Sequence, residues 1–172
     1  MIRELSYQDS RSFIASFEKL ENPSPLSTDW VDVEEKNATY IWFLELEDTI
    51  EKPLGFLSYK ILVLPNTLEF VYIVKIYVLK THRGEDPILI NDERVSKILF
   101  DEIDRKDVNI LTLESACTNL DVYYKRLGFE YNVDISNEFL AVIGTREEIL
   151  YRRRENPSNI MSDTEKEIFG EK

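Results

Sequence analysis

Glycine is scarce in this chain, which has 172 residues and only five glycines. An average protein contains about 7% glycine, which corresponds to roughly twelve at this length. No two of the five lie close enough for a G-x-G-x-x-G turn, and none begins a G-K-S or G-K-T loop. The chain therefore lacks the dinucleotide-binding fingerprint and the Walker phosphate loop, which excludes Rossmann-type dehydrogenases and P-loop nucleoside triphosphatases.

Cysteine and histidine each occur once. Because Cys117 is the only cysteine, no intrachain disulfide can form, which suits a reducing cytosol. His82 is the only histidine, which excludes zinc sites of the cysteine and histidine type and disfavours a Ser-His-Asp relay. We expect Cys117 to be a small apolar residue, and His82 to be a solvated loop residue beside Arg83.

Long apolar runs and basic residues are also in short supply. No run of about 18 apolar residues exists, and Met1–Glu4 lacks the pattern of a signal peptide. Lysine and arginine number 21 against 33 acidic residues, which gives a formal net charge of -12. Phosphate backbones and anionic lipids repel such a chain. We expect a cytoplasmic protein that binds neither nucleic acid nor a membrane and favours cationic partners.

Apolar and aromatic residues are plentiful, at 43% and 12%, so the chain can bury the core of one domain. The patterning predicts a mixed, mostly antiparallel sheet flanked by helices, an α/β fold. Expected strands cover residues 2–5, 40–47, 54–64, 68–79, 108–114, 129–133 and 138–143. Three helices are expected: one after residue 9, one that begins at residue 91 or 92, and one that begins at residue 118 or 119. Gly128 would form the left-handed cap of the third. Residues 26–36 predict a short helix or an irregular loop.

Two motifs stand out within this order of elements. One is I-Y-V-x-x-x-x-R-G, from Ile76 to Gly84, and the other is Y-Y-K-R-L-G-F, from Tyr123 to Phe129. With the order of elements over residues 2–145, they make the chain resemble the GNAT superfamily of N-acetyltransferases. The first motif is similar to the end of that family's fourth strand and the start of its acetyl-CoA loop. The second is similar to its F-Y-E-K-L-G-F signature.

The resemblance implies a fold, a co-substrate and a set of binding residues. Two central strands would splay apart, and the pantetheine of acetyl-CoA would pair with the backbone near Ile76 and Val78. Arg83 and Gly84 would open the loop that holds the pyrophosphate, and Asn119 lies close to a conserved asparagine position of the family. We expect a GNAT-like domain over residues 1–145, and a C-terminal helix and extension over 146–172 in which Arg152 to Arg154 form a solvated helix face.

The resemblance also implies a reaction. Tyr124 would act as the general acid that protonates the leaving thiolate, and Glu69 would take a proton from the substrate amine. The amine, on a small cationic molecule or a protein, would attack the thioester directly, without a metal. Each residue has a structural alternative, since Tyr124 can pack with a bonded hydroxyl and Glu69 can be a solvated strand residue. The oligomeric state is open between a monomer and a homodimer.

The loop after Gly84 departs from the family's R-G-x-G-x-G/A-S pattern. The later glycine positions are Asp86 and Ile88 in one register, and Glu93 and Val95 in the other. Glycine lets the backbone approach a phosphate without a Cβ, and carboxylates repel that phosphate. The sequence therefore supports a second interpretation, a catalytically inactive GNAT-like binding or regulatory module whose acidic surface takes a basic partner.

Overall fold

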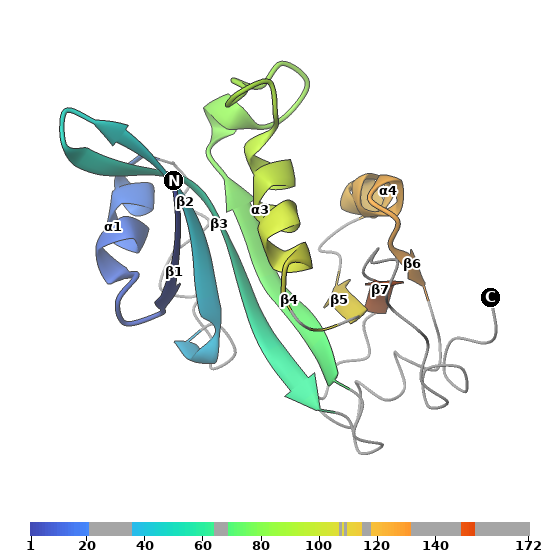
Figure 1. The fold of residues 1–172 in the computed structure, drawn as a ribbon. Helices are drawn as coiled ribbons and strands as arrows, with labels where there is room; N and C mark the ends of the chain where they lie inside the picture. The colour runs from blue at the N-terminus through green and yellow to red at the C-terminus, as the bar shows by residue number, and fades with distance from the viewer. Residues whose placement is uncertain are drawn as a thin grey trace. The chain divides into compact units, whose positions relative to one another are not determined.

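The computed structural model describes residues 1–20, 36–63, 69–106, 108, 110–114, 118–131 and 149–153. Within these ranges the chain forms a seven-stranded sheet in the order β1-β2-β3-β4-β5-β7-β6 (Figure 1). The strands are β1 (Ile2–Ser6), β2 (Thr39–Glu47), β3 (Ile50–Val63), β4 (Glu69–Val78), β5 (Ile110–Glu114), β6 (Glu130–Tyr131) and β7 (Ile149–Arg153). The helices are α1 (Arg11–Leu20), the short 3-10 helix η1 (Lys80–His82), α3 (Val95–Asp104) and α4 (Thr118–Arg126). The predicted α/β class with a mostly antiparallel sheet is confirmed.

The chain consists of two compact units, each of which has most of its contacts between Cα atoms within itself. The first unit contains Met1–Lys60 and Val74–Lys106, and the second contains Ile61–Ile73 and Asp107–Lys172. In the part of the chain that the structure describes, no helix is both long and apolar enough to span a membrane.

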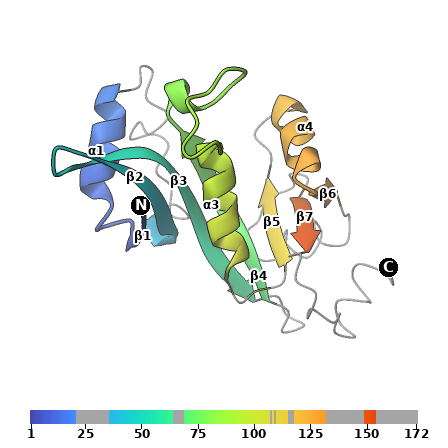
Figure 2. The ribbon, with the colours of Figure 1, turned by 45° about the horizontal axis from the view of Figure 1, so that its top comes forward.

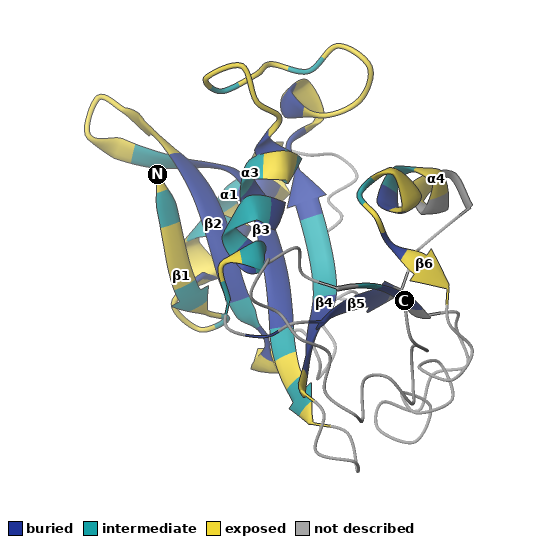
Figure 3. Ribbon diagram, turned by 45° about the vertical axis from the view of Figure 1, so that its right-hand side comes forward, coloured by how far each residue is buried: buried dark blue, intermediate teal, exposed yellow. Residues whose placement is uncertain are grey.

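An aromatic cluster forms the core of the first unit, and Trp42 lies at its centre. The Trp42 ring is 4.9 Å from Phe56 and 5.6 Å from Phe17, between ring centroids. All three side chains are fully buried, as Figure 3 shows for the middle of β2 and β3. Phe17 comes from α1, which buries Ile14 and Phe17, whereas Leu20 at the helix end is exposed. Burial of each large aromatic side chain stabilises the fold by roughly 1.5–3 kcal/mol.

A polar clamp joins β1, β3 and the residue that follows α3 by two positions. The Tyr59 hydroxyl donates a hydrogen bond to Glu4 at 2.6 Å, and the Lys106 ammonium pairs with the other carboxylate oxygen of Glu4. Lys106 also lies 5.4 Å from the centroid of the Tyr59 ring. Burial alone would raise the pKa of Glu4, but the hydrogen bonds from Lys106 and Tyr59 outweigh it and lower that pKa.

The second unit is built around β5. Strand β4 pairs with β5 in parallel, from Val71–Leu111 to Ile73–Leu113. On its other side β5 pairs antiparallel with β7, which in turn pairs with β6 (Figure 2). The apolar residues of β5 are buried, as a strand with neighbours on both sides requires.

The expected C-terminal helix is wrong in its first part, because β7 occupies Ile149–Arg153. Leu150 and Tyr151 are both buried, and β7 gains backbone hydrogen bonds from β5 on one side and β6 on the other. A short apolar segment does not distinguish strand from helix by itself. The expected strand at 138–143 and the rest of the tail lie outside the described residues, as does the boundary at 145, which stays a prediction.

The helix expected from residue 91 or 92 begins later, at Val95. Asn91 and Asp92 have φ of 50° and 65°, in the left-handed region, so they form a turn instead of a first helical turn. Strand β3 begins earlier than expected, at Ile50, because the hairpin turn is confined to two residues. The segment expected over 26–36 lies almost wholly outside the described residues.

Candidate functional site

The end of β4 carries the first two predicted binding residues. The pairing of β4 with β5 ends at Ile73, and β4 continues to Val78. Val74, Lys75 and Ile76 are half-buried, between buried stretches of the same strand. Three successive half-buried residues mean that neither face of β4 is fully covered here, because successive side chains point to opposite faces. Ile76 lies in this partly covered stretch, and Val78 is buried beyond it; their binding roles stay predictions.

Gly55 on β3 determines how closely β3 and β4 approach. A Cβ at Gly55 would lie 2.9 Å from the carbonyl oxygen of Tyr77 and 3.3 Å from a methyl group of Val78. It would also lie 3.1 Å from a methyl group of Val95, the first residue of α3. Glycine is therefore required here for close packing. The sequence alone does not indicate this role, since an isolated glycine in a strand pattern does not reveal its neighbours.

Arg83 and Gly84 open the loop between β4 and α3, as the resemblance implied. The Arg83 guanidinium lies 5.0 Å from the centroid of the Tyr77 ring and 3.4 Å from the Tyr77 hydroxyl. Gly84 has φ of +85°, and nothing lies within 4 Å of the position that a Cβ would take. Glycine is favoured at this position because of the positive φ, and not because a side chain would be crowded.

The β4–α3 loop, residues 83–94, is folded onto its own backbone. The N–H groups of Ile90 and Glu93 donate to each other's carbonyl oxygens, at 2.9 and 3.0 Å. The N–H of Ile88 donates to the carbonyl oxygen of Thr81 at 3.0 Å. Two amide groups are therefore bonded within the loop and a third is bonded to η1, whereas a glycine-rich loop would turn such groups toward a phosphate.

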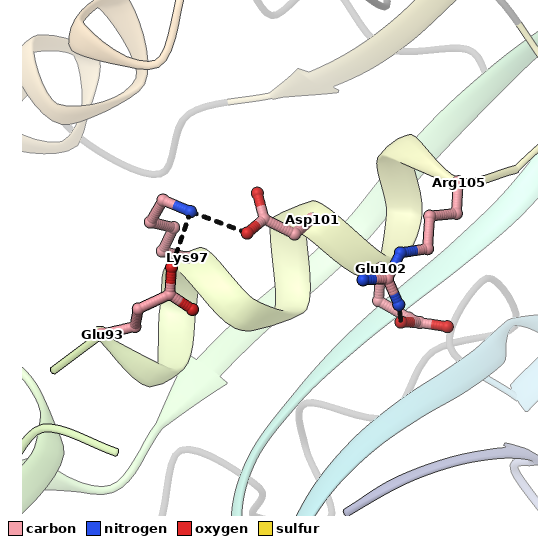
Figure 4. Close-up of polar contacts among 5 residues, drawn as sticks. All are labelled: Glu93, Lys97, Asp101, Glu102 and Arg105. Carbon is pink, nitrogen blue, oxygen red and sulfur yellow. Dashed lines mark hydrogen bonds and ion pairs between the residues drawn. The ribbon is translucent and has the colours of Figure 1, made fainter. Parts of the chain in front are cut away.

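The cations that follow this loop are engaged as well. The Arg94 guanidinium donates to the carbonyl oxygen of Gly84 at 2.9 Å and so closes the loop. The Lys97 ammonium donates to Asp101 at 2.7 Å and to Glu93 at 3.2 Å, as Figure 4 shows. These hydrogen bonds, the one with Asp101 first, raise the pKa of Lys97. Both cations near the start of α3 therefore already have hydrogen-bond partners, a carbonyl oxygen for Arg94 and two carboxylates for Lys97.

His82 is buried, contrary to the expectation of a solvated residue. Only 8% of its surface is exposed. The N–H of His82 donates to the carbonyl oxygen of Leu79. The N–H of Leu79 in turn donates to the carbonyl oxygen of Leu54 on β3. The ring Nδ1 lies 2.8 Å from the Thr81 hydroxyl. Burial lowers the pKa of His82.

In the second unit, the motif from Tyr123 to Phe129 closes the C-terminus of α4. The carbonyl oxygen of Tyr124 accepts hydrogen bonds from the N–H groups of Leu127 and Phe129, at 3.0 and 3.1 Å. Gly128 has φ of +92°, so the predicted left-handed cap is confirmed. The Tyr124 side chain is buried, and its ring meets the Phe129 ring edge to face at 6.1 Å. The Tyr124 ring is therefore packed against Phe129.

Arg152 lies on a strand and not on the solvated helix face that the sequence predicts. It is half-buried on β7, and its guanidinium donates to the carbonyl oxygen of Leu127 at 3.1 Å. The same guanidinium lies 5.2 Å from the centroid of the Phe129 ring. A Cβ at Gly128 would lie 3.3 Å from the Arg152 side chain. Arg152 therefore packs against each residue of the Leu-Gly-Phe motif.

The remaining predicted residues also lie in the second unit. Glu69 is the first residue of β4, and its side chain is exposed. Asn119 lies in the first turn of α4, where the structure does not describe its side chain. The structure thus brings Ile76, Val78, Arg83 and Gly84 together in the first unit and places the expected catalytic residues in the second. The roles of Glu69 and Asn119 stay predictions.

The fold matches solved structures, although neither a protein-family model nor a curated protein matches the sequence. A Lactobacillus plantarum protein assigned as an N-acetyltransferase aligns at a TM-score of 0.58 and 11% identity, over 90% of this chain and 97% of that one. An acetyltransferase of the GNAT family from Staphylococcus aureus aligns at 0.52 and 14% identity, over 90% of this chain and 100% of that one. Arabidopsis thaliana NAA60 in complex with acetyl-CoA aligns at 0.52 and 14% identity, over 91% and 99%.

These alignments cover nearly the whole of each chain, while the sequence identity is too low to carry residue roles across. They support a likeness of the whole fold. The resemblance inferred from the two motifs is therefore confirmed at the level of the fold: the chain has the fold of the GNAT-family N-acetyltransferases.

Proposed function

We propose that this protein is an acetyl-CoA-dependent N-acetyltransferase that acts on a primary amine. The observation that carries the proposal is the GNAT fold together with a buried Tyr124, packed against Phe129, in a motif that resembles the family's signature. Solved proteins of this fold include one described in complex with acetyl-CoA.

The residues of the first unit fit acetyl-CoA in part. The N-cap residue of α3, Arg94, makes no side-chain hydrogen bond to the helix N-terminus, so that side chain leaves the first-turn N–H groups uncovered. A helix N-terminus favours a phosphate, and the exposed Arg83 adds a positive charge at the loop start. Glu85 and Asp86 oppose this attraction. The backbone near Ile76 and Val78 would hold the pantetheine.

When bound, acetyl-CoA supplies an activated acetyl thioester. Glu69, directly or through water, takes the proton that the amine releases as the new nitrogen–carbon bond forms. Tyr124 donates its hydroxyl proton to the sulfur as the carbon–sulfur bond breaks. No covalent enzyme intermediate is needed.

The acceptor is a cationic molecule in this proposal. The net charge of -12 attracts amines such as polyamines, aminoglycosides or lysine side chains over long range. A cytoplasmic location accompanies the proposal as an expectation from the sequence, which leaves the oligomeric state open between a monomer and a homodimer.

One observation supports a second candidate, a binding module without catalysis. The β4–α3 loop uses its amides internally, Arg94 is bonded to Gly84, and Lys97 is paired with two carboxylates. A loop in this state offers fewer donors to a pyrophosphate than a glycine-rich loop does.

A thermal-shift titration with coenzyme A separates the two candidates. We expect saturable stabilisation of the natural chain, larger in Glu85→Gln/Asp86→Asn and largest in Glu85→Gly/Asp86→Gly, where charge and Cβ atoms are both removed. At a ligand concentration of one hundred times Kd the stabilisation is about 2.7 kcal/mol. Glu18→Gln, an exposed residue of α1, serves as the control for total charge.

The outcomes divide clearly. No shift in any variant at millimolar coenzyme A removes the acetyltransferase proposal and leaves the binding module. A shift only in the double variants shows a cofactor site that the loop carboxylates close in the natural chain.

A further inference from the structure

A polar pocket lies in the first unit, at the junction of β1, α1 and β2. Its cavity volume is about 680 Å³, and its walls are the turn Ser6–Gln8, Arg11 at the start of α1, and the segment Lys36–Thr39. This volume lies within the range of small-molecule sites. It also exceeds what a bare phosphate or carboxylate group fills.

The lining of this pocket has a charge opposite to that of the whole protein. Among the described residues that line it, Arg11 and Lys36 are the only ionisable cations and none is a carboxylate, on a chain with 33 acidic and 21 basic residues. Among the described residues neither cation forms an ion pair or a hydrogen bond. Apart from Ala38, the other lining residues carry neutral polar side chains. Two unpaired cations with neutral hydrogen-bonding groups form an arrangement that attracts an anion.

The walls of the pocket are held in place by the fold. Ser6 and Thr39 are paired across β1 and β2. The N–H and hydroxyl of Ser10 both donate to the carbonyl oxygen of Ser6, at 3.0 and 2.7 Å, and the Trp42 indole donates to the Ser10 hydroxyl at 2.8 Å. Because this turn is tied to the buried Trp42, a ligand would meet a largely preformed site, which lowers the cost of binding.

The pocket is separate from the β4–α3 loop within the first unit. At the pocket, Thr39 pairs with Tyr59 on β3. Before the loop, the N–H of Leu79 donates to the carbonyl oxygen of Leu54, also on β3. The two contacts are five residues apart on an extended strand, roughly 16 Å. Figure 1 shows the loop and the start of β2 toward opposite ends of β3.

We propose that this pocket binds a small anionic molecule with a phosphate or carboxylate group, which Arg11 and Lys36 hold. The inference goes beyond the proposed acetyl transfer, because neither residue belongs to the proposed acetyl-CoA or catalytic residues. The remaining polar walls would contact the body of the ligand.

The test uses the full chain labelled with ¹⁵N and titrated with inorganic phosphate or citrate, at an ionic strength held constant with potassium chloride. We expect saturable shifts of the amide signals of Ser6–Arg11 and Lys36–Thr39. Arg11→Met and Lys36→Met should each weaken binding by about 10- to 100-fold, the effect of losing one charged hydrogen bond. Both side chains are exposed, so the variants should fold.

Lys19→Met is the matched control, since Lys19 is an exposed cation on the same helix, and its binding should equal that of the natural chain. A response to phosphate or to citrate supports the proposal and identifies the preferred anionic group. No saturable response to either probe overturns it, as does undiminished binding in both pocket variants. A parallel coenzyme A titration keeps the two proposals apart: the pocket proposal survives a failure to bind coenzyme A, whereas weaker coenzyme A binding in Arg11→Met overturns the separation.

Discussion

The guanidinium of Arg152 on β7 donates a hydrogen bond to the carbonyl oxygen of Leu127, which follows α4 by one residue. Helix C-termini leave carbonyl groups without intrahelical partners and carry a partial negative charge. Arg152 supplies both a donor and a positive charge at this point. A strand that follows α4 by more than twenty residues in sequence therefore fixes the end of the helix that bears Tyr124.

Arg152→Met should lower the free energy of unfolding by about 1–3 kcal/mol, because it removes a charged hydrogen bond and a cation–aromatic contact while keeping apolar bulk. Urea denaturation measures the change. Arg152→Lys should recover only part of it, since an ammonium lacks the planar fork of a guanidinium. Arg126→Met, at an exposed cation of α4, is the control, and an equal loss there would attribute the effect to total charge.

Tyr124→Phe should lower kcat for acetyl transfer by roughly 10²- to 10⁴-fold, the range of a proton-transfer group. The ring contact with Phe129 remains, so the fold and coenzyme A affinity should be preserved. Release of free thiol from acetyl-CoA with a panel of amines measures the rate. Tyr123→Phe, the neighbouring tyrosine, is the control. An unchanged kcat in Tyr124→Phe would eliminate the general-acid role.

His82 should make stability depend on pH. Burial lowers the folded-state pKa of His82, and the charge of Lys52 lowers it further. The charge of Glu45 acts in the other direction and raises it. The unfolded chain therefore takes up a proton first as the pH falls below about 6.5. Stability should be full above that pH and decline as the pH falls toward the folded-state value, by at most about 1.4 kcal/mol per pH unit.

Urea unfolding at a series of pH values between 5.5 and 7.5 tests this dependence. His82 is the only histidine, so no other side chain has an ordinary pKa inside this window. In His82→Gln the dependence of the unfolding free energy on pH should fall to the small slope that the carboxylates contribute. A slope that persists unchanged in this variant would show that His82 is not its source.

Gly55→Ala should destabilise the first unit by about 1–3 kcal/mol, because its Cβ would lie 2.9 Å from a backbone oxygen that cannot rotate away. Gly84→Ala is the comparison, since nothing crowds that position and only its positive φ opposes a side chain, at about 1 kcal/mol. Chemical denaturation gives both values. Adding Val95→Ala to Gly55→Ala should recover only a part of the loss. Full recovery would show that the side chain and not the Tyr77 carbonyl sets the limit.

Local chemistry in the sequence predicts much of the fold. The apolar residues of β4 need a buried strand, and the stripe at Ile14 and Phe17 needs a helix packed against a core. Gly128 needs only its own backbone conformation to end α4. Such features depend on residues within one or two turns of each other, so a single sequence contains the information.

The candidate site could be predicted less completely. The places of Arg83 and Gly84 at the start of the loop follow from a motif and are seen in the structure. How the loop bonds to itself, through Arg94 and Gly84, depends on a contact across ten residues that no motif describes. The pairing of Lys97 with two carboxylates follows helical spacing and could have been anticipated.

By itself, the sequence determined the α/β class, the order of the elements from β1 to β6 and the end of α4, because periodicity and turn chemistry act over a few residues. Only the tertiary structure decided that Ile149–Arg153 is a strand, that His82 is buried and that Arg152 supports the Leu-Gly-Phe motif. Each of these depends on contacts between segments that are distant in the chain. Short segments have no strong preference of their own, so burial and backbone pairing with such distant partners determine their structure.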